Sequence, residues 1–354
     1  MNWIRKTPFK NQLGFFDFYK GILMICIPVL HILNLWKASE GAWDASTLIS
    51  KTSVVVVSFF VISGYGFRPT NMRKCLKKQC QQILLPYIYM AVACIAIIML
   101  KNLVRGRALL VDVAPCVRGF LFSHTGSSSL FGKHIFEVSS GWFLWTLFLA
   151  WIILNTVFLL KDEKKIHAAV VCLGVLGMCL TLRSSWIWCI PQSLLAAVLL
   201  YIGYLIKTKK FFARVMPVKY IVLCALLFGV SLVFGASNMG SNYWKLGALD
   251  YLGTVAGTIL LLKIYSYILM PDNLFTEVIM TIGRYSYWIV CLHGIDMIAI
   301  NFENIIVHFQ LPYVANVLLH MGLDVLFIAA GCKVMLTVKK YKIKKSLYGG
   351  KKHD

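Results

Sequence analysis

The fold is decided by apolar runs of membrane-spanning length, and the first of them carries the most information. Residues 13–36 read LGFFDFYKGILMICIPVLHILNLW. An apolar stretch of about 20 residues is long enough to cross the hydrocarbon core of a bilayer as a helix. The run is too long for the apolar core of a signal peptide, and no small-residue cleavage site follows it. The sequence therefore predicts a first transmembrane helix here.

Nine further runs of the same character follow, and the composition agrees with them. The chain is 59% hydrophobic and 14% charged, whereas soluble domains are about 25% charged. The further runs are 51–67, 83–100, 141–160, 166–182, 187–206, 220–236, 247–269, 285–301 and 313–336. They leave no room for a separate soluble domain, and the sequence shows no internal repeat. We therefore predict an all-α polytopic membrane protein of about ten transmembrane helices, a single membrane domain over residues 1–354 that ends in a basic cytoplasmic tail at 337–354.

The basic residues predict the orientation of these helices. The chain has 36 Lys and Arg against 14 Asp and Glu, a formal net charge of +22. In a soluble protein such an excess points to nucleic acid, but in a membrane protein Lys and Arg gather on the cytoplasmic side. Here about two thirds of them fall in segments on the side of the two termini. We expect both termini in the cytoplasm and no nucleic-acid partner.

One segment departs from this rule. Residues 101–140 lie on the predicted outer side, yet they carry five basic residues, among them Arg105, Arg107 and Arg118. A segment of this length is either a solvated loop or a cap over a site. A third possibility is that part of it re-enters the membrane.

Ionisable residues inside the first run mark a candidate catalytic stripe. At 100° per residue, Asp17, Lys20 and His31 project from one face of a helix. Asp17 and Lys20 are expected to pair, and His31 lies about 16 Å further along the axis. A neutral imidazole at that depth can take a proton from a hydroxyl group as a general base. The alternative is a buried histidine that only makes a hydrogen bond between helices.

The ninth run carries a second polar face. Residues 282–296 read IGRYSYWIVCLHGID and contain Arg284, Ser286, His293 and Asp296. Ser286 and His293 share a face but are about 10 Å apart along the axis, too far for a catalytic triad. We interpret this face as the wall of a cavity, with Asp296 one turn after His293 as its possible orienter. Structural packing is the alternative.

Two further segments are candidates for substrate binding. The second run ends in FFVISGYGFR, residues 59–68, where Ser63 and Tyr65 are possible hydrogen-bond donors to a reacting oxygen. Small residues at such a position also allow close helix approach. Trp142 opens the fourth run, where an interfacial aromatic belt is the alternative interpretation.

Motifs for metals and common cofactors are missing. The eleven cysteines include no C-x-x-C pair, and the sequence has no H-E-x-x-H, P-loop or G-x-G-x-x-G motif. We therefore expect no metal site and no permanently bound cofactor.

Taken together, these blocks resemble the acyltransferase family 3 of integral membrane O-acyltransferases. Asp17-x-x-Lys20-Gly21 followed by His31 is similar to the signature of the family's first helix, with Lys20 where many members have Arg. The later blocks that resemble the family are Phe59 to Tyr65, Leu84-Leu85-Pro86-Tyr87, Trp142-Phe143-Leu144, Ile202-Gly203-Tyr204 and Ile282 to His293. The resemblance covers most of the chain. It implies that His31 is the catalytic residue, assisted by Asp17 and Lys20.

The resemblance also implies the reaction. A short acyl group, most often acetyl, would pass from cytoplasmic acyl-CoA to a hydroxyl group of a sugar or lipid-linked acceptor of the cell envelope, in the cytoplasmic membrane of a bacterium. The expected phosphate-binding residues are Arg68, Arg73, Lys74, Lys77 and Lys78. The sequence departs from the family's pattern next to these residues. Gln79 and Gln82 occupy the positions of an R-x-x-R pair that many members use with acyl-CoA.

Two other functions remain open at this stage. A bundle with Asp17, His293 and Asp296 inside the membrane could be a proton-coupled secondary transporter or exporter. The chain could also be a catalytically silent partner of an envelope-synthesis complex. Solute flux without a CoA donor would favour the transporter, and lack of acyl-CoA binding would favour the silent partner.

Overall fold

The computed structural model describes residues 14–36, 52–125, 129–130, 132–182, 186–268 and 273–349, and the described part is almost entirely helical. The principal helices are α1 (Gly14–Leu35), α3 (Val54–Tyr65), α4 (Met72–Gln79), α5 (Leu85–Val104), α6 (Val113–Phe122), α7 (Gly141–Val157), α8 (Glu163–Leu180), α9 (Ile190–Thr208), α10 (Val218–Phe234), α11 (Ala248–Tyr267), α12 (Leu274–Ile295), α13 (Phe302–Ile306) and α14 (Tyr313–Gly349). Two π-helical turns, η2 (Cys80–Leu84) and η6 (Asp296–Ile300), continue α4 into α5 and α12 towards α13. Short 3₁₀ turns are η3 (Phe158–Leu160), η4 (Ile187–Cys189), η5 (Phe211–Ala213) and η7 (Val307–Phe309).

Within the described ranges, the strands form two small antiparallel hairpins. β1 (Ser129–Leu130) pairs with β2 (Lys133–His134), and β3 (Ser237–Asn238) pairs with β4 (Tyr243–Trp244). Both hairpins join helices, so helix packing alone forms the core.

Glycines set the closest helix contacts. A Cβ on Gly21 of α1 would lie 2.0 Å from the carbonyl oxygen of Ile279, and one on Gly283 of α12 would lie 1.8 Å from that of Asp17. Gly64 of α3 and Gly203 of α9 meet backbone of the other helix in the same way. Small residues let membrane helices approach to backbone contact. The α1–α12 and α3–α9 pairs are therefore fixed by residues that have no side chain.

The described helices confirm an all-α fold but not the count of ten transmembrane helices. Each predicted run contains a helix. By length and composition, six described helices are candidates to cross a membrane: Gly14–Leu35, Met72–Val104, Gly141–Leu160, Ile187–Thr208, Ala248–Tyr267 and Tyr313–Thr337. A seventh candidate is the pair Leu274–Ile300 and Phe302–Phe309, which is bent by 50°. Helices α3 and α10 have only 12 and 17 residues, short of the roughly 20 that span a bilayer.

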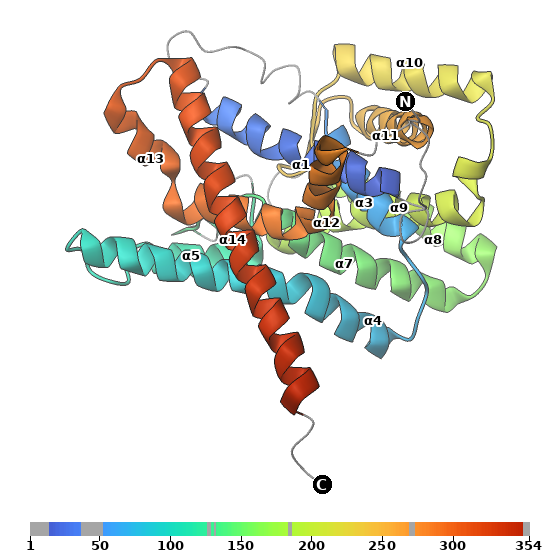
Figure 1. Cartoon of the computed structure of the whole chain (residues 1–354). Coiled ribbons are helices and arrows are strands. Elements are labelled where there is room, and N and C mark those ends of the chain that lie inside the picture. Colours follow the sequence, from blue (N-terminus) through green and yellow to red (C-terminus); the bar gives the residue numbers. More distant parts are fainter. Residues whose placement is uncertain are drawn as a thin grey trace.

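Helix α14 lies on the outside of the bundle. It packs against α1, α12 and α13, and its C-terminal end extends past the other helices (Figure 1). The helix continues to Gly349, through the start of the tail predicted at residue 337. At the opposite edge of the bundle, α10 and α11 lie side by side (Figure 1).

The basic outer segment is folded where it is described. Helix α6 packs on α5, and the Tyr87 hydroxyl donates a hydrogen bond of 2.6 Å to the carbonyl oxygen of Phe120. Arg118 donates to the carbonyl oxygen of His134 at 3.0 and 2.8 Å, which ties α6 to the β1–β2 hairpin. His124 is fully buried, and this burial lowers the pKa of its imidazole. A fully solvated loop therefore does not describe this part of the chain.

Candidate active site

A cavity of ≈ 380 Å³ lies between α1, α3, α7 and α12. Its size is typical of small-molecule sites. Phe59, Phe143 and Leu147 contribute to a mostly apolar wall. Six of the residues that the sequence singled out line it: Lys20, His31, Ser63, Trp142, Arg284 and Ser286. Residues from four separate sequence blocks therefore meet in one place.

The cavity extends along α1. Lys20 and His31 both line it from that helix, and their eleven-residue separation corresponds to about 16 Å along the axis. The His31 imidazole is exposed to the cavity rather than packed. A ligand in the cavity can therefore reach a cation at one end and an imidazole at the other.

Three charged residues cluster at the Lys20 end. The Lys20 ammonium lies 2.9 Å from one carboxylate oxygen of Asp17, which confirms the predicted pair. The Arg284 guanidinium lies 3.3 Å from the other oxygen. One carboxylate thus holds two partly exposed cations, and this end of the cavity keeps a net positive charge. That charge suits an anionic ligand.

At the other end, His31 faces a second histidine. The ring centroids of His31 and His293 are 5.5 Å apart and the rings are tilted by 47°. His293 is fully buried, and its Nδ1 lies 3.0 Å from Oδ2 of Asp324 on α14. An ionised carboxylate can only accept hydrogen bonds, so the proton of a neutral His293 is on Nδ1. His31 of α1, His293 of α12 and Asp324 of α14 therefore form one row of titratable side chains, which ends at the cavity.

The predicted pairing of His293 with Asp296 is wrong. Asp296 accepts instead from Nε2 of His320, at 3.0 Å, and His320 accepts at Nδ1 from the Trp36 indole at 3.2 Å. Asp296 also accepts from the backbone N–H of Phe302, at 3.1 Å. Helix α14 instead supplies a separate partner to each residue, since His320 and Asp324 are four residues apart on it.

Two of these residues escaped sequence reasoning although a signal was present. His320 and Asp324 are four residues apart within the apolar run 313–336, and both are almost completely buried. Ionisable residues within a membrane helix are functional candidates by default. The rule that selected His31 therefore also selects these two residues on α14.

A second cavity of ≈ 310 Å³ adjoins the first. The two share Ser63 and Tyr287, and the second is also lined by Gln79, Gln82 and Trp151. The Tyr287 hydroxyl donates to the carbonyl oxygen of Gln82. Gln79 and Gln82 thus line a cavity that shares two wall residues with the His31 cavity.

Of the predicted phosphate-binding residues, Lys78 lies beside the second cavity. Arg73, Lys74, Lys77 and Lys78 belong to α4 and are exposed, as is Arg68 in the preceding linker. Gln79 and Cys75 form the buried face of α4, so the cations project away from the bundle. The Lys78 ammonium lies 5.9 Å from the ring centroid of Trp151, at the second cavity.

Tyr65 does not reach either cavity. Its ring packs against Phe16 and Phe212, with centroids 5.0 and 5.9 Å away, because it is on the other side of α3 from the cavity wall. Ser63 does line the cavity, but its hydroxyl donates to the carbonyl oxygen of Phe59 at 2.8 Å. The predicted substrate-binding role of Tyr65 is therefore not supported by its position.

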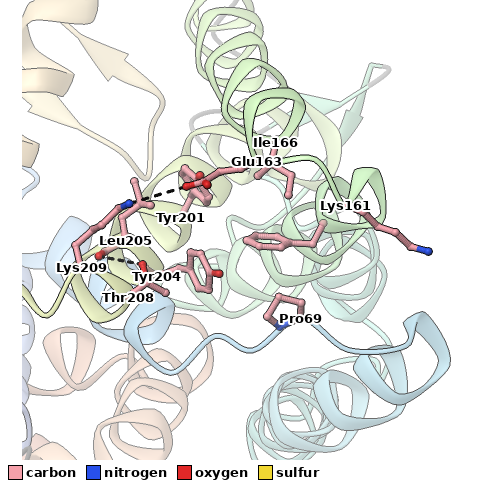
Figure 2. A pocket seen from close by; sticks show the side chains of 10 residues that line it. Pro69, Lys161, Glu163, Ile166, Tyr201, Tyr204, Leu205, Thr208 and Lys209 are labelled. Atoms are coloured by element: carbon pink, nitrogen blue, oxygen red, sulfur yellow. Dashed lines mark hydrogen bonds and ion pairs between the residues drawn. The ribbon is translucent and has the colours of Figure 1, made fainter.

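A third hollow, of ≈ 390 Å³, lies elsewhere and contains none of the predicted site residues. It is formed at the ends of α7, α8 and α9 around Tyr201, Tyr204 and Leu205 (Figure 2). Lys209 and Glu163 face each other across it at 4.0 Å, and both are exposed (Figure 2). Aromatic and lysine side chains are common where helices leave a membrane, so this hollow is not assigned to the reaction.

The family follows from comparison with known proteins. Residues 13–337 match the model of the acyltransferase 3 family, which is described as an acyltransferase domain. No curated protein and no solved structure matches the chain. Because the match covers nearly the whole chain, the protein belongs to this family and is an acyltransferase. The family and the apolar helices together indicate a multi-pass membrane protein.

Proposed function

We propose that this acyltransferase moves a short acyl group, in the first place acetyl, from cytoplasmic acyl-CoA to a hydroxyl group of an envelope sugar or lipid-linked sugar. The observation that carries the proposal is the exposure of His31 to a cavity whose other end holds Lys20 and Arg284. The cavity has a base at one end and an anion-binding end at the other, with a mostly apolar wall between them. The base suits the thioester and the acceptor hydroxyl group, and the cationic end suits the negatively charged part of acyl-CoA.

The shape of the cavities supports a route for the donor. Acyl-CoA has a bulky polyanionic nucleotide and a thin arm that ends in the thioester. The exposed cations of α4 and Arg68 would attract the nucleotide. The arm would pass Gln79 and Gln82 and continue past Ser63 and Tyr287 towards His31.

His31 would then act as the general base. It takes the proton of the acceptor hydroxyl while the oxygen attacks the thioester carbonyl. The carbon–sulfur bond breaks, the CoA thiolate leaves and recovers the proton, and the acceptor carries the new ester. Ser286, which lines the same cavity, is the remaining predicted donor to the developing oxyanion.

The charge distribution supports an orientation and a location for this reaction. With both termini in the cytoplasm, the cations of α4 and the Lys20 end of the cavity face the compartment that contains acyl-CoA. The cytoplasmic membrane of a bacterium fits such a donor and an envelope acceptor. The protein needs no bound metal or cofactor in this scheme, with acyl-CoA as a co-substrate.

A proton-coupled transporter has one observation in its favour. The bent pair formed by α12 and α13, with its 50° break, is similar to the discontinuous helices of transporters. Transporters usually carry such breaks in both halves, and within the described ranges this is one isolated case. Solute flux in proteoliposomes without any CoA donor would support transport.

The test is transfer by the purified protein in nanodiscs. With radiolabelled acetyl-CoA and envelope extract, the wild type should release CoA and label an acceptor, while His31→Ala should lose both by a factor of about 1,000 or more. His308→Ala, which changes an exposed histidine outside the cavity, is the matched control. Mass spectrometry of envelope glycans and lipids, with and without the gene, would identify the acceptor. Full transfer by a folded His31→Ala protein would refute the mechanism.

A further inference from the structure

Two His–Asp pairs join α12 and the following turn η6 to α14. His293 of α12 binds Asp324 of α14, and Asp296, the first residue of η6, binds His320 of α14, each at 3.0 Å. All four side chains are at most 2% exposed. The two pairs therefore have the same chemistry, the same length and the same burial, and they differ only in their surroundings.

The His320 pair is closed. The Trp36 indole can only donate, so Nδ1 of His320 accepts and Nε2 carries the proton that goes to Asp296. The second oxygen of Asp296 accepts from the backbone N–H of Phe302. Every polar atom of this pair has a partner, as expected of a structural contact.

The His293 pair is open at both ends. Nε2 of His293 and Oδ1 of Asp324 are buried and have no hydrogen-bond partner among the described residues. Asp324 borders a mostly apolar groove between α1, α12 and α14, and its Oδ1 is buried from solvent. A carboxylate with so little solvation gains most from the N–H of His293. The pair is thus arranged to hold one tautomer of His293, with the lone pair of Nε2 available.

We infer that Asp324 and His293 form a positioning dyad for His31, the base in the proposed function on which this inference rests. The 5.5 Å between the ring centroids is about one hydrogen bond between imidazoles, and catalytic hydrogen bonds often tighten only when substrate binds. On substrate binding, Nε2 of His293 would accept the N–H of His31, so that the other nitrogen of His31 presents its lone pair to the acceptor hydroxyl. When His31 takes the acceptor's proton, the positive charge is stabilised through His293 by Asp324.

The test compares the open pair with the closed one. Asp324→Asn makes the wrong tautomer of His293 available, and His293→Gln removes the imidazole. Each should lower kcat by about 100-fold or more, while the KM for acyl-CoA changes less than about twofold. Asp324→Glu, which keeps the carboxylate, should regain part of kcat. His320→Gln removes a pair of equal length and burial between the same helices, so it should lower the melting temperature and leave kcat near the wild type.

A second readout does not depend on turnover. In ¹⁵N-histidine spectra, with His293→Gln used to assign the signal, His293 should be protonated at Nδ1 in the wild type and shift towards Nε2 in Asp324→Asn. An unchanged tautomer, a wild-type kcat in Asp324→Asn, or an equal kcat loss in His320→Gln would overturn the inference. If His31→Ala is also fully active, the proposed function fails, and the tautomer still decides whether Asp324 orients His293.

Discussion

Nδ1 of His293 lies 3.0 Å from Oδ2 of Asp324, and this contact joins a residue that lies against the His31 cavity to the outermost long helix of the bundle. The two residues are 31 positions apart in the sequence. The same helix pair carries the reversed contact between Asp296 and His320. The candidate site is therefore joined to α14, a helix that does not line the His31 cavity.

Gln82→Arg tests the donor route. Gln82 lines the second cavity and stands at a position where many family members are basic. An added guanidinium there should lower the KM for acyl-CoA about threefold to tenfold, and the gain should shrink at high salt. Gln81→Arg adds the same charge one residue away, at an exposed position outside the cavity lining. Equal effects of both variants would mean that only bulk charge matters.

Lys20→Met tests the cationic end of the cavity. We expect kcat/KM for acyl-CoA to fall about tenfold or more, because the charge that faces the cavity is removed. The melting temperature should change little, since a partly exposed ion pair contributes little to stability and Asp17 keeps its ion pair with Arg284. Lys20→Arg should retain most activity. Lys209→Met, which breaks an exposed pair elsewhere, is the control, and loss of activity there would argue against a specific role for Lys20.

Gly283→Ala tests the close contact that places His31 beside His293. The new methyl group would lie 1.8 Å from the carbonyl oxygen of Asp17, so α1 and α12 must separate. We expect a loss of about 2 kcal/mol or more in stability, as in overpacked cores, together with loss of transfer. Gly322→Ala on α14 meets open space and should be neutral. Thermal unfolding in detergent measures the stability of both variants. An unchanged stability of Gly283→Ala would show that the helices are not in backbone contact.

Arg105→Gln combined with Arg107→Gln tests whether the outer segment binds an anionic acceptor. Both side chains are exposed on the predicted outer side. Their loss should raise the KM for the acceptor several-fold and leave the KM for acyl-CoA unchanged. Lys219→Gln, on the opposite predicted side, serves as the charge control. An unchanged acceptor KM would leave the segment with a structural role only.

Local patterns predicted much of the site. The helical period placed Lys20 and His31 on one face of α1, and both line the cavity. The spacing of Asp17 and Lys20 predicted their ion pair. These inferences succeed because the α-helix fixes the direction of each side chain within one element. The same logic failed for Asp296, since the partners of His293 and Asp296 come from another helix, α14.

By itself, the sequence determined the all-α membrane class, the candidate base and the family blocks, because hydropathy and helical period are properties of single segments. Only the tertiary structure decided which histidine meets which aspartate, that Tyr65 lies away from the cavity, and that Gln79 and Gln82 line a cavity next to that of His31. Those contacts join helices far apart in the chain. Their partners are selected by backbone contact at glycines and by the need of buried polar atoms for hydrogen bonds, and neither depends on distance along the sequence.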